Sequence, residues 1–265
     1  DSMVFNNKME LLMFLKKEYV TFLGSGSQGR TYFNKKNKQV FKIMEQFFDD
    51  EDDECHIDYT PMEFMRFSGI SNNTYIFSDG IVYVGDEVVG YTMRYGAGKL
   101  LSSINPMLIN LDKFIKSINQ VVSDNAILAK NGVKTYDVPY NILYGNNGFK
   151  IIDTVEYYNS DEGYDAILKN NNDAFNWGIM YFLVDGYFDD FVINNSELKD
   201  MYLSNGIDIQ EFILLYRKYL SEYIGNDIVK LNDAKRCLNK KLCNKNYERS
   251  YRWYKYYWKS KYIMI

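Results

Sequence analysis

Three glycines separated by small polar residues, Gly24-Ser25-Gly26-Ser27-Gln28-Gly29, lie between two stretches that have the composition of β-strands, residues 19–23 and 31–33. A polar turn at 34–38 then leads into a further predicted strand over 39–44. Because a strand follows the last glycine, the motif belongs to a β-hairpin. This disfavours a dinucleotide-binding βαβ unit, in which a helix follows. Such a hairpin lets backbone amides approach phosphate groups closely, and an ordinary glycine-rich turn is the alternative for this motif taken alone.

Lys42 lies in the strand over 39–44, where its side chain alternates with those of its apolar neighbours. On a cleft-facing surface it is placed to meet the α- and β-phosphates of a nucleotide and a carboxylate of the next helix. That helix is predicted over 62–69, and Glu63 is its best candidate carboxylate. Met93 and Tyr95 complete the candidate nucleotide-binding residues, together with all six residues of the glycine motif. The alternatives are a solvent-facing lysine and a solvated helix charge.

The pattern changes from strands to helices near Gly96–Gly98, where we place the domain boundary. Before it, a helix is expected over 7–18 and strands over 75–77, 81–84 and 88–95, with a hairpin turn at 78–80. After it, helices are expected over 111–130, 173–187, 196–204 and 208–223. We therefore predict an α+β protein with a β-rich lobe over residues 1–95 and a helical lobe over residues 96–265.

A second motif follows in the helical part: Tyr136-Asp137-Val-Pro-Tyr-Asn141-Ile-Leu, and then Lys150-Ile-Ile-Asp153. Together with the glycine hairpin and Lys42, it makes the chain resemble the protein kinase superfamily over residues 19–190. The resemblance implies a two-lobed, ATP- and Mg²⁺-dependent enzyme that moves the γ-phosphoryl group to a Ser, Thr or Tyr hydroxyl of a protein. It implies that Asp137 accepts the proton of that hydroxyl and that Lys42 is the second catalytic residue. It assigns Asn141 and Asp153 to the metal.

A third match is Asp173-Ala-Phe-Asn-Trp-Gly178, which is similar to a buried helix of protein kinases. The resemblance implies that Asp173 binds the backbone of the catalytic loop and has a structural role. Small-molecule kinases of the same superfamily show this string less often. The match therefore favours a protein substrate over a small molecule.

The chain departs from the family in its catalytic loop. Thr135 and Tyr136 replace the usual His-Arg pair, and no cation lies between Asp137 and Asn141. Loss of one preorganised donor costs on the order of a hundred- to a thousandfold in rate, so another cation is expected to substitute, with Arg30 or Lys134 as candidates, or the enzyme is slow. The absence of the family's arginine and of an Ala-Pro-Glu string predicts an enzyme that is not switched by loop phosphorylation.

Three alternatives stay open on these residues. A small-molecule kinase has the same fold, and a pseudokinase binds a nucleotide or a partner without catalysis. The missing loop cation and the position of Asn141, one residue earlier than in the family, favour the pseudokinase, whereas retention of Lys42, Asp137, Asn141 and Asp153 opposes it. Nucleotidyl transfer to a protein is the last alternative, and nothing in the sequence selects it.

Composition narrows the setting in which the chain works. The net charge of −4 gives no global indication of nucleic-acid binding. Three cysteines, at 55, 237 and 243, lack close metal-ligand spacing, which favours free thiols in the cytoplasm. The single histidine, His56, disfavours a histidine-based metal site or a catalytic triad. No apolar run approaches the length of a membrane span, and no signal peptide is visible.

Two biased segments have both a functional and a structural interpretation. The C-terminal stretch Lys245–Lys261 carries an aromatic stripe at helical spacing beside several cations. We favour a last helix that packs its aromatic face on the lobe, and the alternative is a patch for anionic lipid or nucleic acid. The acidic run 49–54 suits a basic peptide, but solvated loops of like charge are commoner.

Overall fold

The computed structural model describes residues 2–49, 59–204 and 206–238. His56, two of the cysteines, nearly all of the acidic run and the C-terminal stretch lie outside these ranges, and within them Cys237 is a free thiol. The chain divides into two compact units. The first comprises residues Asp1–Gly96 with Ile151–Glu156, and the second Ala97–Lys150 with Tyr157–Ile265. An N-terminal antiparallel sheet and a mainly helical C-terminal part confirm the expected α+β class.

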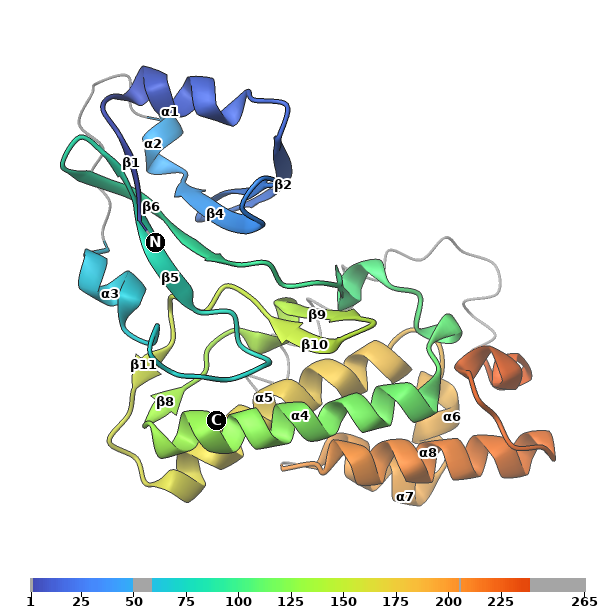
Figure 1. The fold of residues 1–265 in the computed structure, drawn as a ribbon. Coiled ribbons are helices and arrows are strands. Elements are labelled where there is room, and N and C mark those ends of the chain that lie inside the picture. The colour runs from blue at the N-terminus through green and yellow to red at the C-terminus, as the bar shows by residue number, and fades with distance from the viewer. Residues whose placement is uncertain (1, 50–58, 205, 239–265) are drawn as a thin grey trace. The chain divides into compact units, whose positions relative to one another are not determined.

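The first unit is built on a six-stranded sheet with the order β1-β5-β6-β4-β3-β2 (Figure 1). Its strands are β1 (Met3–Phe5), β2 (Val20–Gly26), β3 (Gly29–Asn34), β4 (Gln39–Met44), β5 (Ser78–Val84) and β6 (Glu87–Arg94). Neighbouring strands run antiparallel, except that β1 lies parallel to β5 at the edge. A three-residue edge strand has no pattern of its own to indicate it, and the sequence did not predict β1.

The predicted hairpin turn at 78–80 is wrong, because β5 runs through these residues. Their pairing with β6 shifts register between Ser78 and Gly80, so the glycine marks a β-bulge and not a turn. Asp79, a usual turn residue, accepts a hydrogen bond from the Thr92 hydroxyl at 2.6 Å. The hairpin turn lies instead at Gly85, whose φ of +59° is a left-handed conformation that favours glycine.

Two hydrophobic clusters cover opposite faces of this sheet, as the alternation along β4 requires. Phe41 and Ile43 belong to the cluster that packs against α1 (Lys8–Leu15) and α2 (Gln46–Asp49). Val40 and Met44 belong to the cluster on the other face. It includes Phe64 of α3 (Pro61–Met65) and the partly buried Ile152 and Val155. Lys42 shares this second face, so the segment 151–156 lies on the same side of the sheet as the lysine.

The second unit is mainly helical. Its helices are α4 (Leu111–Lys130), α5 (Tyr164–Val184), α6 (Asp189–Ile193), α7 (Ser196–Leu203) and α8 (Ile209–Ile224), with 3₁₀ turns at Leu101–Ser103, Pro106–Leu108, Val138–Tyr140 and Leu231–Cys237. Short strands pair as β10 (Gly148–Ile151), β9 (Ile142–Gly145) and β7 (Lys99–Leu100), and as β11 (Tyr158–Asn159) with β8 (Val133–Lys134). The core packs Phe114 of α4 against Phe149 and, at 5.7 Å between ring centroids, Phe182 of α5. None of the helices in the described part of the chain is long and apolar enough to span a membrane.

Helix α5 begins at Tyr164, well before the predicted start at residue 173. The run of three asparagines at 170–172 has low helix propensity, so the sequence pattern favoured a loop there. Tertiary hydrogen bonds overcome that preference, since Asn171 is fully buried and Asn172 accepts a bond from Asn125 of α4.

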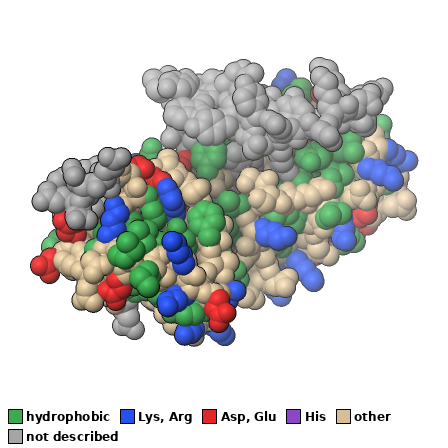
Figure 2. Space-filling view, turned by 90° about the horizontal axis from the view of Figure 1, so that it is seen from above, with side chains coloured by type: hydrophobic (Ala, Val, Ile, Leu, Met, Phe, Trp, Pro, Cys, Tyr) green, Lys and Arg blue, Asp and Glu red, His purple; other side chains and the backbone are tan. Residues whose placement is uncertain are grey.

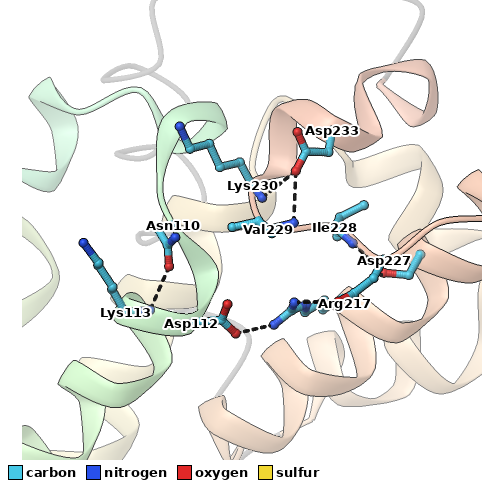
Figure 3. A network of polar contacts seen from close by, with 10 residues as sticks. Asn110, Asp112, Lys113, Arg217, Asp227, Ile228, Val229, Lys230 and Asp233 are labelled. Atoms are coloured by element: carbon cyan, nitrogen blue, oxygen red, sulfur yellow. Dashed lines mark hydrogen bonds and ion pairs between the residues drawn. The ribbon is translucent and has the colours of Figure 1, made fainter.

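A polar network joins the start of α4 to α8 and to the segment after it (Figure 3). Arg217 lies between two carboxylates, 2.5 Å from Asp112 and 3.1 Å from Asp227. Asp233 accepts hydrogen bonds from the backbone N–H groups of Val229 and Lys230. The network therefore links elements far apart in the chain through a charged side chain that is 17% exposed.

Candidate functional site

Lys42 is a buried, charged side chain on the sheet of the first unit. Its side chain is 9% exposed, and its Nζ lies 2.7 Å from Oδ1 of Asp153. The same nitrogen donates to Oε1 of Gln28 at 3.1 Å. A lysine is almost never buried to this extent unless its charge is paired. The structure thus brings together three residues that the sequence singled out, from the glycine motif, from β4 and from the segment after β10.

Asp153 is held in an unfavourable backbone conformation. Its φ is +61°, in the left-handed region that costs a non-glycine residue roughly 1–2 kcal/mol. The residues beside it hold it there: Ile151 exchanges backbone hydrogen bonds with Thr74 and Ile76. The Thr154 hydroxyl donates to the Ile76 carbonyl at 2.9 Å. Strain held by surrounding contacts at a charged side chain is typical of functional positions.

Gln28 connects the glycine hairpin to the segment 151–156. Its amide oxygen accepts from Lys42, and its amide nitrogen donates to Oε1 of Glu156 at 2.9 Å. The chain of contacts therefore runs from Asp153 through Lys42 and Gln28 to Glu156. Sequence reasoning missed Glu156, because only the fold brings this exposed carboxylate to the hairpin.

The three glycines of the motif have different roles in the sheet. A Cβ on Gly29 would lie 2.3 Å from the Ile43 carbonyl oxygen, so the close approach of β3 to β4 requires this glycine. A Cβ on Gly24 or Gly26 would meet nothing within 4 Å. The hairpin does not need these two glycines for its own packing, and the space beside them is open to a ligand.

Ser25 and Ser27 complete the hairpin and are exposed. The remaining candidates on the first sheet are Met93, which is buried, and Tyr95, which is 48% exposed and packs its ring 4.8 Å from that of Phe33. Opposite Lys42 in the register lies Tyr91. Burial, and next the negative charge of Asp153, raise the pKa of Tyr91 well above its ordinary value, so its hydroxyl is neutral.

Glu63 does not contact Lys42 among the described residues. Its carboxylate forms a capping box at the start of α3, accepting from the backbone N–H of Thr60 at 2.7 Å and from the Thr60 hydroxyl. These hydrogen bonds lower the pKa of Glu63. Asp153 therefore takes the position beside the lysine for which the sequence analysis selected Glu63.

In the second unit, Asp137 and Asn141 flank the 3₁₀ turn Val138–Tyr140. Asp137 is the second described aspartate with a left-handed backbone, at φ +52°. Nδ2 of Asn141 donates to the Asp137 backbone carbonyl at 2.9 Å, which leaves its Oδ1 to face other partners. Both residues that the sequence placed in this loop are held by its own turn.

The segment before Asp137 is fixed by Asn171, which the sequence did not indicate. Oδ1 of this fully buried asparagine accepts from the Thr135 backbone N–H at 2.9 Å, and its Nδ2 donates to the Val133 carbonyl at 3.0 Å. Asp173, which was expected to bind this backbone, pairs instead with Lys169, one turn away on α5. The expectation was wrong because the helix turns residue 171, and not residue 173, toward the loop.

Gly178 serves the same loop from the next turns of α5. A Cβ at this position would lie 2.8 Å from Cδ1 of Ile142 and 3.2 Å from Cα of Pro139. Only a glycine lets α5 approach the turn this closely. The Gly178 match in the sequence thus has a packing reason in the second unit.

Arg30 and Lys134, the cations suggested as substitutes for the missing loop cation, each bind a glutamate. Arg30 is paired in register with Ile43, so it lies on the sheet face opposite Lys42, where Glu45 binds it at 2.6 Å. Lys134 binds Glu162 at 2.7 Å, and this hydrogen bond raises the pKa of Lys134.

Comparison with protein-family models and with curated proteins finds no match for this chain. Within the described ranges, no group of three or more His, Cys, Asp or Glu side chains forms a metal cluster. Asp153 in the first unit and Asn141 in the second each offer an oxygen ligand of the kind that Mg²⁺ accepts when phosphates supply further ligands. The open space beside Gly24 and Gly26 and the buried, paired ammonium of Lys42 fit a bound nucleotide.

Proposed function

We propose that this chain is an ATP- and Mg²⁺-dependent, protein kinase-like phosphotransferase that acts on a Ser, Thr or Tyr hydroxyl of a protein. The observation that carries the proposal is the buried Lys42, 2.7 Å from an Asp153 with a left-handed backbone, beside the glycine hairpin. Pairing satisfies the charge of the buried ammonium, but it supplies no reason for the left-handed backbone of Asp153 or for the open space beside Gly24 and Gly26. Phosphate binding and metal binding give them one.

Bound Mg-ATP supplies the γ-phosphoryl group that is transferred. Lys42 would hold the α- and β-phosphates by hydrogen bonds, and the Asp153 carboxylate would hold the metal, which would neutralise charge on the phosphates as ADP leaves. Backbone amides of residues 24–29 cover the phosphates, since the hairpin has no side chain at Gly24 or Gly26 to obstruct them.

On the second unit, Asp137 orients the substrate hydroxyl and accepts its proton. Asn141 offers the metal its Oδ1 while its Nδ2 holds the loop backbone. Asn171 and Gly178 position this loop by hydrogen bonding and by close packing, respectively.

Intact mass measured after incubation with Mg-ATP tests the proposal, with the Asp137→Asn variant beside the wild type. We expect a phosphoryl mass gain, on the chain or on an added generic protein substrate, from the wild type alone. A nucleotidyl gain would replace the proposal with nucleotidyl transfer. Mg-ATP binding with no transfer to either acceptor would contradict it.

One observation favours a nucleotide-binding module without transfer. Both candidate substitute cations, Arg30 and Lys134, are bound by a glutamate. The loop itself has no lysine or arginine between Asp137 and Asn141. Such a module binds Mg-ATP through Lys42 and Asp153 but leaves no mass gain. Binding and transfer measured on one sample separate the two functions.

A further inference from the structure

Helix α1 exposes two large apolar side chains in its eight residues, whereas α8 exposes two, Leu214 and Tyr223, in sixteen. Met9 and Met13, one turn apart, are 64% and 58% exposed, whereas α4 has one exposed large hydrophobic residue, Val122, in twenty. The inner side of α1 already buries Leu11 completely. The methionines are therefore not needed for the core, and exposed apolar groups that gather on one face indicate an interaction surface.

Four exposed lysines lie near the C-terminal end of α1. Two of them follow α1 directly, and two lie in the turn between β3 and β4. That turn is held against Tyr19: the Lys35 backbone N–H donates to the Tyr19 carbonyl at 2.9 Å, and Nζ of Lys36 lies 3.8 Å from the Tyr19 ring centroid. The Tyr19 ring in turn contacts Phe14 of α1 edge-on. The lysine–methionine surface consists of Met9, Met13, Lys16, Lys17, Lys35 and Lys36.

Figure 2 views the molecule from the side on which α1 lies in Figure 1, and Lys and Arg side chains, with some Asp and Glu, lie beside hydrophobic ones there. The surface is cationic on a chain whose net charge is −4. Glu10 and Glu18 are the acidic residues of the same segment, and Glu10 is bound by the backbone and side-chain nitrogens of Asn6. The lysine–methionine surface therefore has four lysines, with Glu10 and Glu18 exposed in the same segment.

We propose that the lysine–methionine surface docks on an anionic membrane. Unbranched methionine side chains enter the interfacial region, and lysine side chains reach the anionic head groups. A single-stranded nucleic acid fits less well, because its bases stack on exposed aromatic rings and Lys36 covers the ring of Tyr19. The inference is independent of the proposed phosphotransfer.

Co-sedimentation of the full chain with phosphatidylcholine vesicles, with and without phosphatidylserine, tests this surface. We expect binding that requires phosphatidylserine and falls as salt shortens the Debye length. Lys16→Glu with Lys17→Glu should weaken binding by at least about tenfold, since each lysine near an anionic surface contributes roughly fivefold. Met9→Asn with Met13→Asn should weaken it several-fold while the salt dependence persists.

The matched control is Lys116→Glu with Lys199→Glu, which changes the net charge equally at exposed helix positions of the second unit. Its binding should stay within about twofold of wild type, because the charge lies outside the docking surface. Equal losses in both charge variants would overturn the proposal, as would wild-type binding in the Lys16, Lys17 variant. Binding of polyaspartate without binding of vesicles would assign the surface to an acidic protein and overturn it too.

Discussion

Each unit contains a mostly buried basic side chain that is paired with carboxylate, and the two arrangements differ in what surrounds the charge. Arg217 joins Asp112 and Asp227, which are 62% and 76% exposed, and the network connects helix ends. Lys42 binds an Asp153 that is one-third exposed and backbone-strained, beside two glycines with open space around them. The Arg217 pairs have a structural role, because they connect α8 to the start of α4 and to the segment after α8. The second arrangement pairs a buried ammonium with a carboxylate on a strained backbone, and strain of this kind is typical of functional positions.

The largest expected effect is on the rate of phosphoryl transfer, which should depend on Lys42 and not on Arg217. Lys42→Met should lower Mg-ATP-dependent transfer at least about a hundredfold, because it removes a preorganised cation at the phosphates. Its free energy of unfolding should change by only about 1 kcal/mol, since Asp153 is exposed enough to be hydrated.

The control is Arg217→Ala, which should show the reverse: about 1 kcal/mol lost from the free energy of unfolding and transfer unchanged. Transfer rates and urea unfolding of both variants provide the comparison. Equal losses of transfer in the two variants would remove the distinction between the arrangements.

The glycine motif sharpens the contrast within a single hairpin. Gly29→Ala should lower the free energy of unfolding by about 1–3 kcal/mol or more, because its Cβ meets the Ile43 carbonyl. Gly26→Ala should leave it unchanged or raise it by up to about 1 kcal/mol, since the unfolded chain loses freedom and no contact is strained. The affinity for Mg-ATP, measured by calorimetry, should nevertheless fall in Gly26→Ala. Unchanged affinity would show that the open space is not the nucleotide's.

Two substitutions on α5, one at Asn171 and one at Asp173, test which residue holds the loop before Asp137 in place. Asn171→Ala leaves the Thr135 N–H and the Val133 carbonyl buried without this partner, which should cost about 1–3 kcal/mol. Asp173→Asn loses only a pair with a lysine that is 64% exposed, and should cost less than about 1 kcal/mol. Thermal unfolding of both variants measures this. A larger loss in Asp173→Asn would restore the role that the sequence analysis gave that residue.

The smallest expected effect is the pH dependence of the Arg217 region. Hydrogen bonds from the backbone N–H groups of Lys230 and then Val229 lower the pKa of Asp233. Because the folded value is below the unfolded one, the stabilisation is fully present above about pH 4 and is lost as the pH falls through the folded pKa.

The carboxylate of Asp233 is exposed, so we expect a difference of only about 0.5–1 kcal/mol between wild type and Asp233→Ala at neutral pH. Unfolding measured at descending pH should show this difference shrinking below about pH 4. A difference that grows on acidification would contradict the assigned cause.

Local periodicity predicted the parts of the site that lie on one strand or turn. Alternation along β4 placed Lys42 on the other face of the sheet from Phe41 and Ile43. The glycine motif and the strands on either side of it indicated a hairpin. The partners of Lys42 depend on tertiary structure. Asp153 meets Lys42, and Glu156 meets Gln28, because Ile151 forms backbone hydrogen bonds with Thr74 and Ile76, and no local pattern contains that information.

The same limit explains what the sequence missed in the second unit. Asn171 lies in a run of asparagines that reads as a loop, and its importance comes from burial against Thr135. The family pattern pointed to Asp173 because it specifies residue type and spacing, whereas the rotation of α5 decides which side chain faces the loop.

The most direct test of the central claim is calorimetric titration of the full chain with ATP, with and without Mg²⁺, for wild type and Asp153→Asn. We predict that the wild type binds ATP more tightly when Mg²⁺ is present and that the variant, although folded, loses this gain. Wild-type protein that is folded but does not bind ATP would contradict the account. So would an Asp153→Asn variant whose Mg²⁺ dependence equals that of the wild type.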